Sequence, residues 1–319
     1  MTGPAFLHRA CPLCGSDAAT AEVHSRQRAE DMTLDALRPF WSGLFKEKRF
    51  FSYHRCAACG LLYTPVFFDG PQLADLYSSM APNMDLIASD AIAATQRGYF
   101  DAAAATTQLD GGYLEIGPDI GYIVAEAARR GRFDHFWLFE PNLGVHDQLS
   151  AAAGAAPSTI LPDMDDLSTV PDGSVGLAVM VHVLDHLLDP LATLAQIRAK
   201  LRPGGTLMIV THDEQSLLRR VMGVRWPPFC LQHPELYNPT TMGNLLTRAG
   251  YGAVVVERSR NHFPIDFLAR QAAWTVGVTL NRVPLPALSI GLRLGNILTL
   301  AAAPAHAAER VSIRPVAAL

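Results

Sequence analysis

Four of the five cysteines in this sequence of 319 residues occur in two closely spaced pairs. Cys11 and Cys14 lie in CPLCG, and Cys56 and Cys59 lie in CAACG. Two C-x-x-C pairs in one chain are typical of a tetrahedral zinc site with four thiolate ligands. A disulfide framework is disfavoured by the missing signal peptide, and a redox motif would need only one pair. The pattern therefore predicts one structural zinc ion and leaves Cys230 as a buried free thiol.

A second feature with chemical potential is the stretch YLEIGPDIGY at residues 113–122. An apolar run that ends in Glu115 and a glycine turn is how the loop for a nucleotide-type cofactor begins. Gly117 and Gly121 are expected at the N-terminus of a helix, where free backbone N–H groups meet a ligand. Glu140 follows Gly121 by nineteen residues, where a carboxylate can accept hydrogen bonds from both hydroxyls of a ribose. This pairing predicts a site for a cofactor that contains a ribose.

Histidines follow two further apolar runs and could move protons. His182 and His186 come after SVGLAVMV, and His212 ends TLMIVTH. Because imidazole is the side chain best suited to take up a proton near neutral pH, these three are the candidate catalytic residues, led by His186 and His212. A metal held by His182 and His186, four residues apart, is an alternative for which no third ligand is suggested. Asp185 could instead cap the helix that follows.

These residues lie at the ends of predicted secondary-structure elements. From residue 111 the chain alternates apolar strands with helices, which is typical of a doubly wound α/β domain. Strands are expected in GYLEIG, HFWLFE, PSTILP, SVGLAVMVHV, TLMIVTH, GAVVVE and NILTLAAA. The helix after the fourth strand should begin with Asp189 as its N-cap and stop at Gly204 and Gly205. In such a sheet ligands bind at the carboxyl ends of the strands, where the glycine loop and the histidines fall.

The order of these motifs resembles that of class I S-adenosylmethionine (SAM)-dependent methyltransferases. The motifs are the glycine loop, the acid in FEPN, PDMDDL, HVLDHLLDP and LRPGG, which together cover roughly residues 95–260. The segment at 216–251 is similar to bacterial small-molecule methyltransferases of the ubiquinone-biosynthesis type, some of which carry an N-terminal zinc knuckle pair.

The resemblance implies an α/β fold with a Rossmann-like seven-stranded methyltransferase sheet. It further implies a small N-terminal zinc-ribbon-like module and a helical insertion before the last strand. The expected activity is biosynthetic methyl transfer from SAM to an oxygen or carbon of a small molecule, such as a natural product, a sugar or a quinone-like compound.

The resemblance also implies which residues hold SAM. Glu115 and Gly117 would flank its methionine part, and Glu140 would hold its ribose. Arg97, upstream of the loop, could meet the SAM carboxylate. The remaining predicted cofactor-binding residues are Pro118, Asp119 and Gly121 in the loop, Pro141 beside the ribose acid, Asp163 and the Met164 backbone at the adenine, and His182.

Two positions depart from the family pattern. The family usually has glycine where this chain has Asp119, and an acid near the start of the fourth strand, where this chain has Gly176. Aspartate tolerates a left-handed backbone, so Asp119 is expected to keep the shape of the loop. If it crowds the site instead, the chain would be a SAM-fold protein with a decayed or repurposed cofactor site that acts as a non-catalytic partner. An oxidoreductase is disfavoured, because the loop lacks the glycine that lets a pyrophosphate approach.

Composition narrows the partners and the compartment. With a formal net charge of -4, the chain is not expected to bind nucleic acid by bulk electrostatics. No apolar run is long enough for a membrane span and no signal peptide is evident, so a cytoplasmic protein is expected. The predicted segments are a zinc-binding module with a helical insert at 1–66, a helical linker or lid at 67–110, the SAM-binding domain at 111–305 with its insertion at 261–292, and a tail at 306–319.

Overall fold

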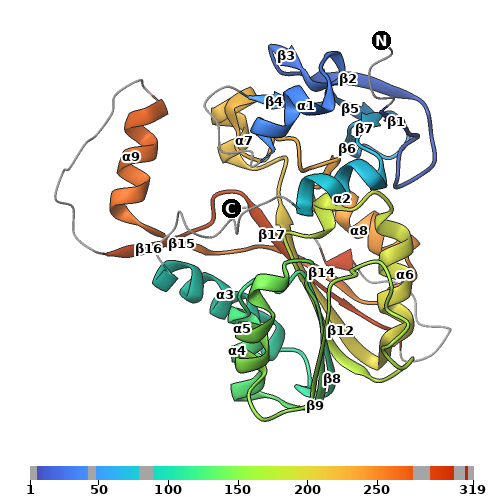
Figure 1. Ribbon diagram of the computed structural model, residues 1–319, viewed down its shortest axis with the longest axis vertical. Coiled ribbons are helices and arrows are strands. Elements are labelled where there is room, and N and C mark those ends of the chain that lie inside the picture. The colour runs from blue at the N-terminus through green and yellow to red at the C-terminus, as the bar shows by residue number, and fades with distance from the viewer. Residues whose placement is uncertain (1–5, 42–47, 79–88, 276–287, 305–312, 315–319) are drawn as a thin grey trace.

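A mixed β-sheet forms the centre of the protein (Figure 1). The computed structural model describes residues 6–41, 48–78, 89–275, 288–304 and 313–314. Seven strands lie in the order β10, β9, β8, β11, β12, β17, β14, and the short β18 adds to the β14 edge. Their bounds are β8 Asp110–Ile116, β9 Arg132–Phe139, β10 Ser158–Leu161, β11 Val175–Val181, β12 Leu201–His212, β14 Val254–Arg258, β17 Asn296–Ala302 and β18 Ile313–Arg314.

The direction of the strands follows from the connections between them. The strands from β10 to β12 are parallel, and β17 runs antiparallel to both of its neighbours, β12 and β14. The predicted α/β fold with a seven-stranded Rossmann-like sheet is therefore confirmed. The carboxyl ends of β8, β9, β11 and β12 meet at one edge, so the residues that follow them share one side of the molecule.

Helices cover both faces of this sheet (Figure 1). On one face lie α3 (Ser89–Ala104), α4 (Tyr122–Arg130) and α5 (His146–Ala153), and on the other lie α6 (Pro190–Lys200) and α8 (Pro239–Arg248). Each face has its own apolar core, one containing Leu194 of α6 and the other containing Val124 of α4. Because the middle strands are buried on both faces, they read as continuous apolar runs instead of alternating ones.

Helix α6 begins as the sequence predicts and ends earlier. The Asp189 side chain accepts a backbone N–H of the first turn at 3.0 Å, so its role as N-cap is confirmed. The expected stop at Gly204 and Gly205 is wrong, since the helix ends at Lys200 and both glycines lie inside β12. The physical reason is Pro203, which disfavours a helical backbone at the preceding residue and lacks the N–H that a helix needs.

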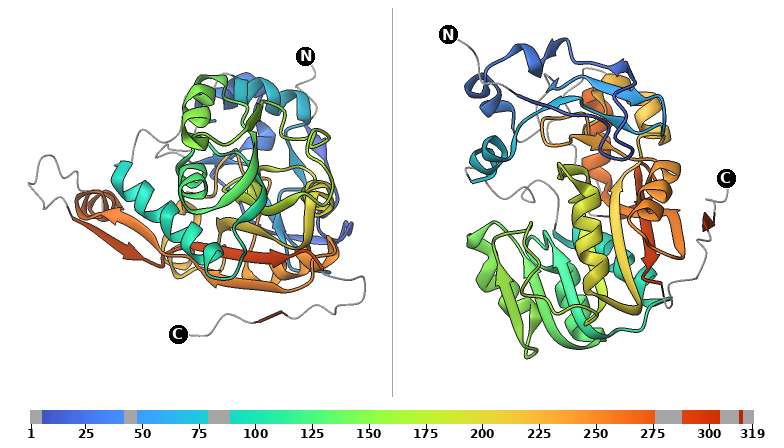
Figure 2. Two further views of the ribbon diagram at one scale, coloured as in Figure 1. Left: turned by 90° about the horizontal axis from the view of Figure 1, so that it is seen from below. Right: turned by 90° about the vertical axis from the view of Figure 1, so that its right-hand side faces the viewer.

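The N-terminal residues form a small sheet that a distant part of the chain completes. Its strands are β2 (Ala19–Val23), β5 (Tyr53–Cys56), β6 (Leu62–Tyr63) and β13 (Glu235–Leu236). The last of these lies between α7 (Leu217–Met222) and α8 in the sequence. The small sheet sits beyond the carboxyl ends of the parallel strands (Figure 2). The N-terminal module is therefore built into the wall of the strand-end region.

Short elements surround this module. They are β1 (Leu7–His8), paired with β7 (Val66–Phe67), β3 (Gln27–Arg28), paired with β4 (Arg49–Phe50), and the helices α1 (Leu34–Leu37) and α2 (Gly70–Ser78). Leu37 and Trp41, from the insert between the cysteine pairs, are buried in one cluster with Phe67 and Leu231. The insert thus packs away from the cysteines, as its length suggests.

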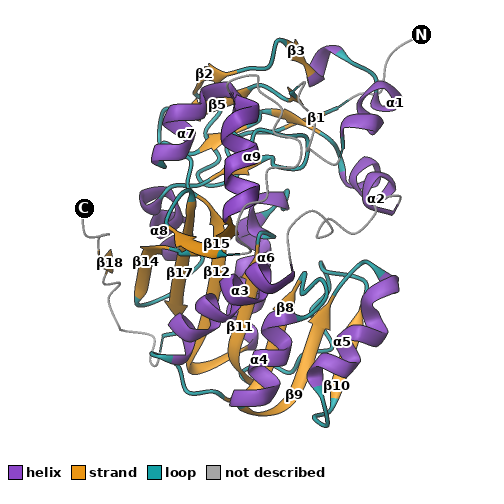
Figure 3. Ribbon diagram, turned by 90° about the vertical axis from the view of Figure 1, so that its left-hand side faces the viewer, coloured by secondary structure: helices purple, strands orange, loops and turns teal. Residues whose placement is uncertain are grey.

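Between β14 and β17 the chain leaves the central sheet (Figure 3). The described part of this insertion is a hairpin of β15 (Asn261–Pro264) and β16 (Ser289–Leu292) with helix α9 (Ile265–Thr275). The backbone N–H of His262 donates to Thr95 Oγ1 of α3 at 2.7 Å, which ties the hairpin to the body. Residues 276–287 and most of the predicted tail lie outside the described residues, and the predicted segment boundaries stay predictions.

None of the helices in the described part of the chain is long and apolar enough to cross a membrane.

Candidate functional site

The glycine loop follows β8 and adopts the left-handed backbone conformation three times. The φ angles are +66° at Gly117, +51° at Asp119 and +82° at Gly121, and Pro118 between them is buried. A Cβ atom on Gly117 would lie 2.5 Å from Cγ2 of Val183, so a side chain does not fit there. Asp119 takes the conformation that glycine usually supplies, which confirms that it keeps the turn.

Glu140 connects this loop to the end of β9. Its two carboxylate oxygens accept the backbone N–H groups of Asp119 and Asn142, each at 2.9 Å. The residue is only 7% exposed, and this burial raises the pKa of its carboxyl. A carboxylate has about four lone-pair sites, so each oxygen can still accept a hydroxyl of a ribose. The acceptor sites of Glu140 are therefore compatible with the ribose that it is expected to hold.

Glu115 is the second-last residue of β8, just before the loop, and is more buried than Glu140. It is 2% exposed, and the Tyr113 hydroxyl donates to Oε2 at 2.5 Å. Burial raises the pKa of Glu115 to about 8, although the bond from Tyr113 opposes this shift. At neutral pH the carboxyl therefore holds a proton for most of the time, so it can donate as well as accept.

The other predicted cofactor residues lie around this centre. Pro141 and Asp163 are exposed, Met164 is half-buried, and Asp163 Oδ1 accepts the N–H of Asp165 at 2.9 Å. The guanidinium of Arg97 pairs with Glu126 of α4 at 3.3 Å, and its side chain is 57% exposed. Contact with a SAM carboxylate would require this ion pair to separate, and it stays a prediction.

Gly176 explains why the fourth strand has no acid near its start. A Cβ atom at this position would lie 2.0 Å from the carbonyl oxygen of Asp110 in the neighbouring strand. The pairing of β11 with β8 is irregular here, between Val175 and Leu177. The close backbone approach therefore requires glycine, whatever the ligand of the loop is.

Beside the loop, four imidazoles surround one buried carboxylate. His182 and His186 follow β11, His212 ends β12, and His233 precedes β13. Asp185 is fully buried, and neither of its oxygens accepts a hydrogen bond from a described residue. Its Oδ2 lies 3.8 Å from Nε2 of His212 and 4.0 Å from Nε2 of His233. We call these five residues the histidine cluster.

The charges of the histidine cluster follow from burial and from its own anion. Burial lowers the pKa of His182, His186 and His212, that of His186 to about 3. Burial acts the same way on His233, but Cys230 and Asp185 outweigh it and raise its pKa to about 9. Desolvation opposes the charge of Asp185, and the four imidazoles still hold the pKa of this carboxyl below its usual value. One cation, one anion and three neutral imidazoles result.

The local geometry of two alternatives for this region differs in the structure. Asp185 does not cap the next helix, because it lies within the short 3-10 helix Leu184–His186 and the cap is Asp189. His182 and His186 do not share a helical face, because His182 precedes that helix and has a φ of +54°. The structure does bring further possible ligands near His182, namely Asp185 and, from the end of β12, His212. His182, Asp185 and His212 each offer an atom within 4.8 Å of the others, a spacing compatible with a cation.

Two contributors to the histidine cluster have no signal in the sequence. Tyr77 of α2 places its hydroxyl 2.8 Å from Nδ1 of His186. Asn296, the first residue of β17, lies opposite His212 in the pairing of β12 with β17. Neither belongs to a motif, and only the packing of α2 and the return of the last strand bring them here. His233 differs from these two, because the sequence already predicts that its segment, WPPFCLQHPELY, forms part of the pocket wall.

Comparison with known proteins gives this site a context. The family described as methyltransferase domain matches residues 91–256, a range that includes the glycine loop, the end of β9 and all four histidines of the histidine cluster, and that ends within β14. The chain belongs to the methyltransferase-domain family. None of the curated proteins matches the sequence significantly.

Solved structures with a similar chain path include several methyltransferases of low sequence identity. One comes from the complex between the Haloferax volcanii Trm112 methyltransferase activator and a methyltransferase, with 17% identity, 67% of this chain and 94% of that chain covered, and a TM-score of 0.48. A Bacillus halodurans methyltransferase has 11% identity, coverages of 66% and 99%, and a TM-score of 0.45. A Thermotoga maritima SAM-dependent methyltransferase has 14% identity, coverages of 66% and 91%, and a TM-score of 0.45.

The four paired cysteines come together at the N-terminal edge of the methyltransferase domain. Sγ of Cys11 lies 3.5 Å from Sγ of Cys59, and Sγ of Cys14 lies 3.5 Å from Sγ of Cys56. A tetrahedron with bonds of about 2.3 Å has edges of about 3.8 Å, so the four sulfurs fit one zinc ion. All four are free thiols within 4.8 Å of one another, and no disulfide joins them.

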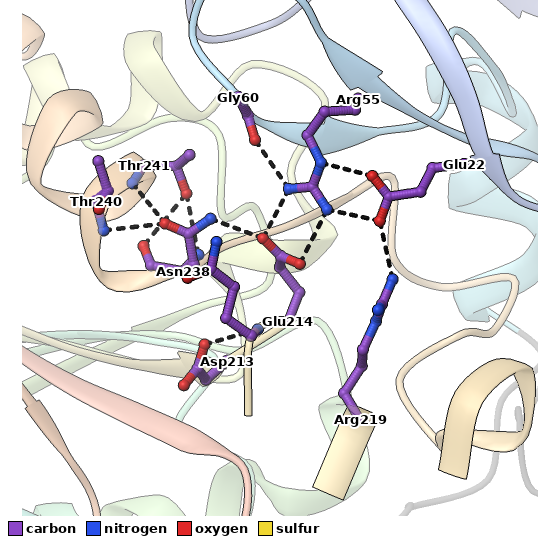
Figure 4. A network of polar contacts seen from close by, with 10 residues as sticks. Glu22, Arg55, Gly60, Asp213, Glu214, Arg219, Asn238, Thr240 and Thr241 are labelled. Atoms are coloured by element: carbon purple, nitrogen blue, oxygen red, sulfur yellow. Dashed lines mark hydrogen bonds and ion pairs between the residues drawn. The ribbon is translucent and has the colours of Figure 1, made fainter. Parts of the chain in front are cut away.

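A polar network joins this cysteine site to the methyltransferase domain (Figure 4). Arg55, next to Cys56, donates to both oxygens of Glu214 at 2.7 and 3.1 Å, and to the carbonyl of Gly60 at 2.9 Å. Glu214 also accepts from Asn238, the N-cap of α8, at 2.7 Å. Because Glu214 stands two residues after His212, the cysteine module supports the strand end that carries the histidine cluster.

Proposed function

We propose that this chain is a SAM-dependent methyltransferase that acts on an oxygen or carbon of a small molecule. The observation that carries the proposal is the contact of Glu140 with the backbone of Asp119. It sets a ribose-binding acid against a glycine loop at the strand edge where the histidine cluster also lies. The methyltransferase-domain family supports the reaction class, and the substrate class rests on the sequence resemblance alone.

The residues around the loop have separable tasks. Glu140 would accept both ribose hydroxyls, while the first N–H groups of α4 face the loop. Glu115 and Gly117 would border the methionine part, and Asp119 would bring a carboxylate toward its positive charge. Bound SAM supplies a methyl group that its sulfonium already activates for displacement. The chain must therefore align the acceptor, exclude water and receive a proton.

One of the three histidines His182, His186 and His212 would accept the proton of the substrate. All three are neutral at the pH of the cell because burial lowers their pKa values. A neutral imidazole has one free lone pair and can take the proton of a hydroxyl or a carbon acid. Asp185, buried beside them, would stabilise the imidazolium that forms.

The cysteine site has a structural task in this proposal. A zinc ion held by Cys11, Cys14, Cys56 and Cys59 would be saturated by four thiolates and would leave no position for a substrate. Its effect on the reaction would be indirect, through Arg55 and Glu214. The cytoplasm stays the expected compartment.

The proposal is tested by calorimetry on the full chain with SAM, with its demethylated product and with NAD. We expect saturable binding of the first two and none of NAD. Glu140→Ala should weaken SAM binding at least tenfold, whereas Glu257→Ala, an exposed acid on β14, should not change it. Absence of SAM binding by the correctly folded chain would instead favour a cofactor site that has decayed, with the chain acting as a non-catalytic partner.

A further inference from the structure

Asn296 stands between two imidazoles that come from neighbouring strand ends. Nδ1 of His212 lies 3.0 Å from Oδ1 of Asn296, and Nε2 of His182 lies 3.2 Å from Nδ2 of the same amide. The two rings face each other, with centroids 4.5 Å apart and planes inclined by 32°. One side-chain amide therefore binds both rings at once.

An amide has an acceptor end and a donor end, and this difference fixes where each ring carries its hydrogen. Since Oδ1 only accepts, Nδ1 of His212 must carry a hydrogen and donate it. Since Nδ2 only donates, Nε2 of His182 must present a lone pair. A neutral imidazole has one N–H, so Nε2 of His212 is left with a lone pair and Nδ1 of His182 carries its hydrogen.

Tyr99 is a further partner of this amide. The ring is 2% exposed, and burial raises its pKa to about 12 although Asn296 hydrogen-bonds its oxygen. An amide nitrogen has two hydrogens to give. An amide whose Nδ2 faces His182 therefore has a second hydrogen for Tyr99 and keeps Oδ1 for His212.

The free nitrogen of His212 points toward the buried carboxylate. Its Nε2 lies 3.8 Å from Oδ2 of Asp185, and the side chain of His212 is 22% exposed. A proton that arrives on this nitrogen would be stabilised by the nearby anion in a buried site. The opposite nitrogen is held by Asn296, in the manner of the third member of a Cys-His-Asn triad.

We propose, resting on the function proposed above, that Asn296 is a positioning residue that fixes the tautomers of His182 and His212 and makes Nε2 of His212 the proton acceptor. In the transfer, the acceptor oxygen or carbon of the substrate forms its bond to the methyl carbon. The electron pair of the broken C–S bond stays on sulfur. The substrate proton passes to Nε2 of His212. The positive charge lost at sulfur thus reappears as imidazolium beside Asp185, and the net charge of the site is unchanged.

This arrangement disfavours a metal ion among His182, Asp185 and His212. A metal would need a lone pair on the ring nitrogen that each histidine turns away from Asn296. The amide leaves such a lone pair on only one of the two rings. The spacing of the three groups is therefore better explained by proton transfer than by a cation.

The test is nuclear magnetic resonance of the full chain with ¹⁵N-labelled histidine, at neutral pH and without added ligand. Long-range ¹H–¹⁵N spectra report which ring nitrogen is protonated, and His182→Gln and His212→Gln variants assign the signals. We expect both rings in the Nδ1–H form. The Nε2–H form at His212 would overturn the proposal, as would a second metal ion per chain that Asp185→Asn removes.

A substitution that changes one end of the amide sharpens the test. Asn296→Asp replaces the donor end by a second acceptor, so His182 should switch to the Nε2–H form while His212 keeps Nδ1–H. Asn244→Asp adds the same charge on an exposed position of α8, away from the rings, and should leave both tautomers unchanged. An unchanged His182 in folded Asn296→Asp would overturn the role of Asn296.

Calorimetry with SAM on the same samples separates this inference from the function on which it rests. The expected tautomers in a chain that does not bind SAM would refute the proposed function alone. SAM binding with both rings in the Nε2–H form would refute the inference alone.

Discussion

The carboxylate of Glu140 accepts the backbone N–H of Asp119 at 2.9 Å, so the end of β9 holds the loop that follows β8. Asp119 has a φ of +51°, and the bond from its N–H stabilises this uncommon conformation. The residue that departs from the family pattern is thus tied to the residue that is expected to bind the ribose. Loop shape and ribose binding depend on one side chain.

Replacement of Glu140 should therefore affect both the shape of the glycine loop and the binding of the ribose. Glu140→Ala removes acceptors whose hydrogen bonds to a charged group contribute about 1.5–3 kcal/mol each, so SAM affinity should fall at least tenfold. Glu140→Gln keeps an acceptor and should lose less. Isothermal calorimetry measures both variants, and wild-type affinity in Glu140→Ala would mean that another acid binds the ribose.

Metal analysis of the purified chain should find one zinc ion, with zinc–sulfur distances of about 2.3 Å by X-ray absorption. Cys56→Ser should lower the free energy of unfolding more than it lowers SAM affinity, because the ion supports the fold and does not touch the substrate. A zinc-free chain, or a disulfide between Cys11 and Cys14, would contradict this prediction.

The buried end of the polar network in Figure 4 should matter more than its exposed end. The Glu214 side chain is 1% exposed, and Glu214→Ala leaves Arg55 without its buried partner, which should cost about 3 kcal/mol in the free energy of unfolding. Glu22, the other partner of Arg55, is 32% exposed, and Glu22→Ala should cost about 1 kcal/mol or less. Urea denaturation of the two variants compares them, and equal losses would refute the coupling through Glu214.

Stability should decline as the pH rises through about 9, where His233 loses its proton. The pKa of this residue is raised above the value of about 6.5 for an unfolded histidine, so its contribution is complete below that value and disappears as the pH passes the folded pKa. Cys230 is one of the groups that raise the pKa of His233, so Cys230→Ala should shift the decline to lower pH. Denaturation at several pH values tests this, with His135→Gln, outside the histidine cluster, as the control. A pH-independent stability between pH 7 and 10 would contradict it.

Turnover depends on which imidazole receives the proton. Loss of a general base typically lowers the rate by roughly 10²- to 10⁴-fold, so the double variant His186→Ala with His212→Ala should lose that much while SAM affinity stays nearly intact. If Nε2 of His212 is the acceptor, His212→Ala alone should show most of this loss. A decrease of less than about tenfold in the double variant would mean that neither histidine is the base.

Most of the secondary structure and the local chemistry could be predicted from the residue pattern. Continuous apolar runs predicted the central strands, because a strand buried on both faces carries few polar residues. The spacing of the cysteines and of Gly117, Gly121 and Glu140 could be recognised, since those residues act within one loop or at two adjacent strand ends. The end of α6 differs from the prediction because Pro203 disfavours a helical backbone at the preceding residue.

Which distant side chains meet depends on how the elements pack in three dimensions. Asn296 reaches His212 because β17 returns antiparallel to β12, and Tyr77 reaches His186 because α2 packs over the strand ends. Arg55 and Glu214 are 159 residues apart and form an ion pair because β13 completes the N-terminal sheet. Sequence periodicity reports the local backbone and which face of an element is buried, but side-chain chemistry depends on distances of a few ångströms between elements. Those distances are set by how the layers pack, and no local pattern encodes them.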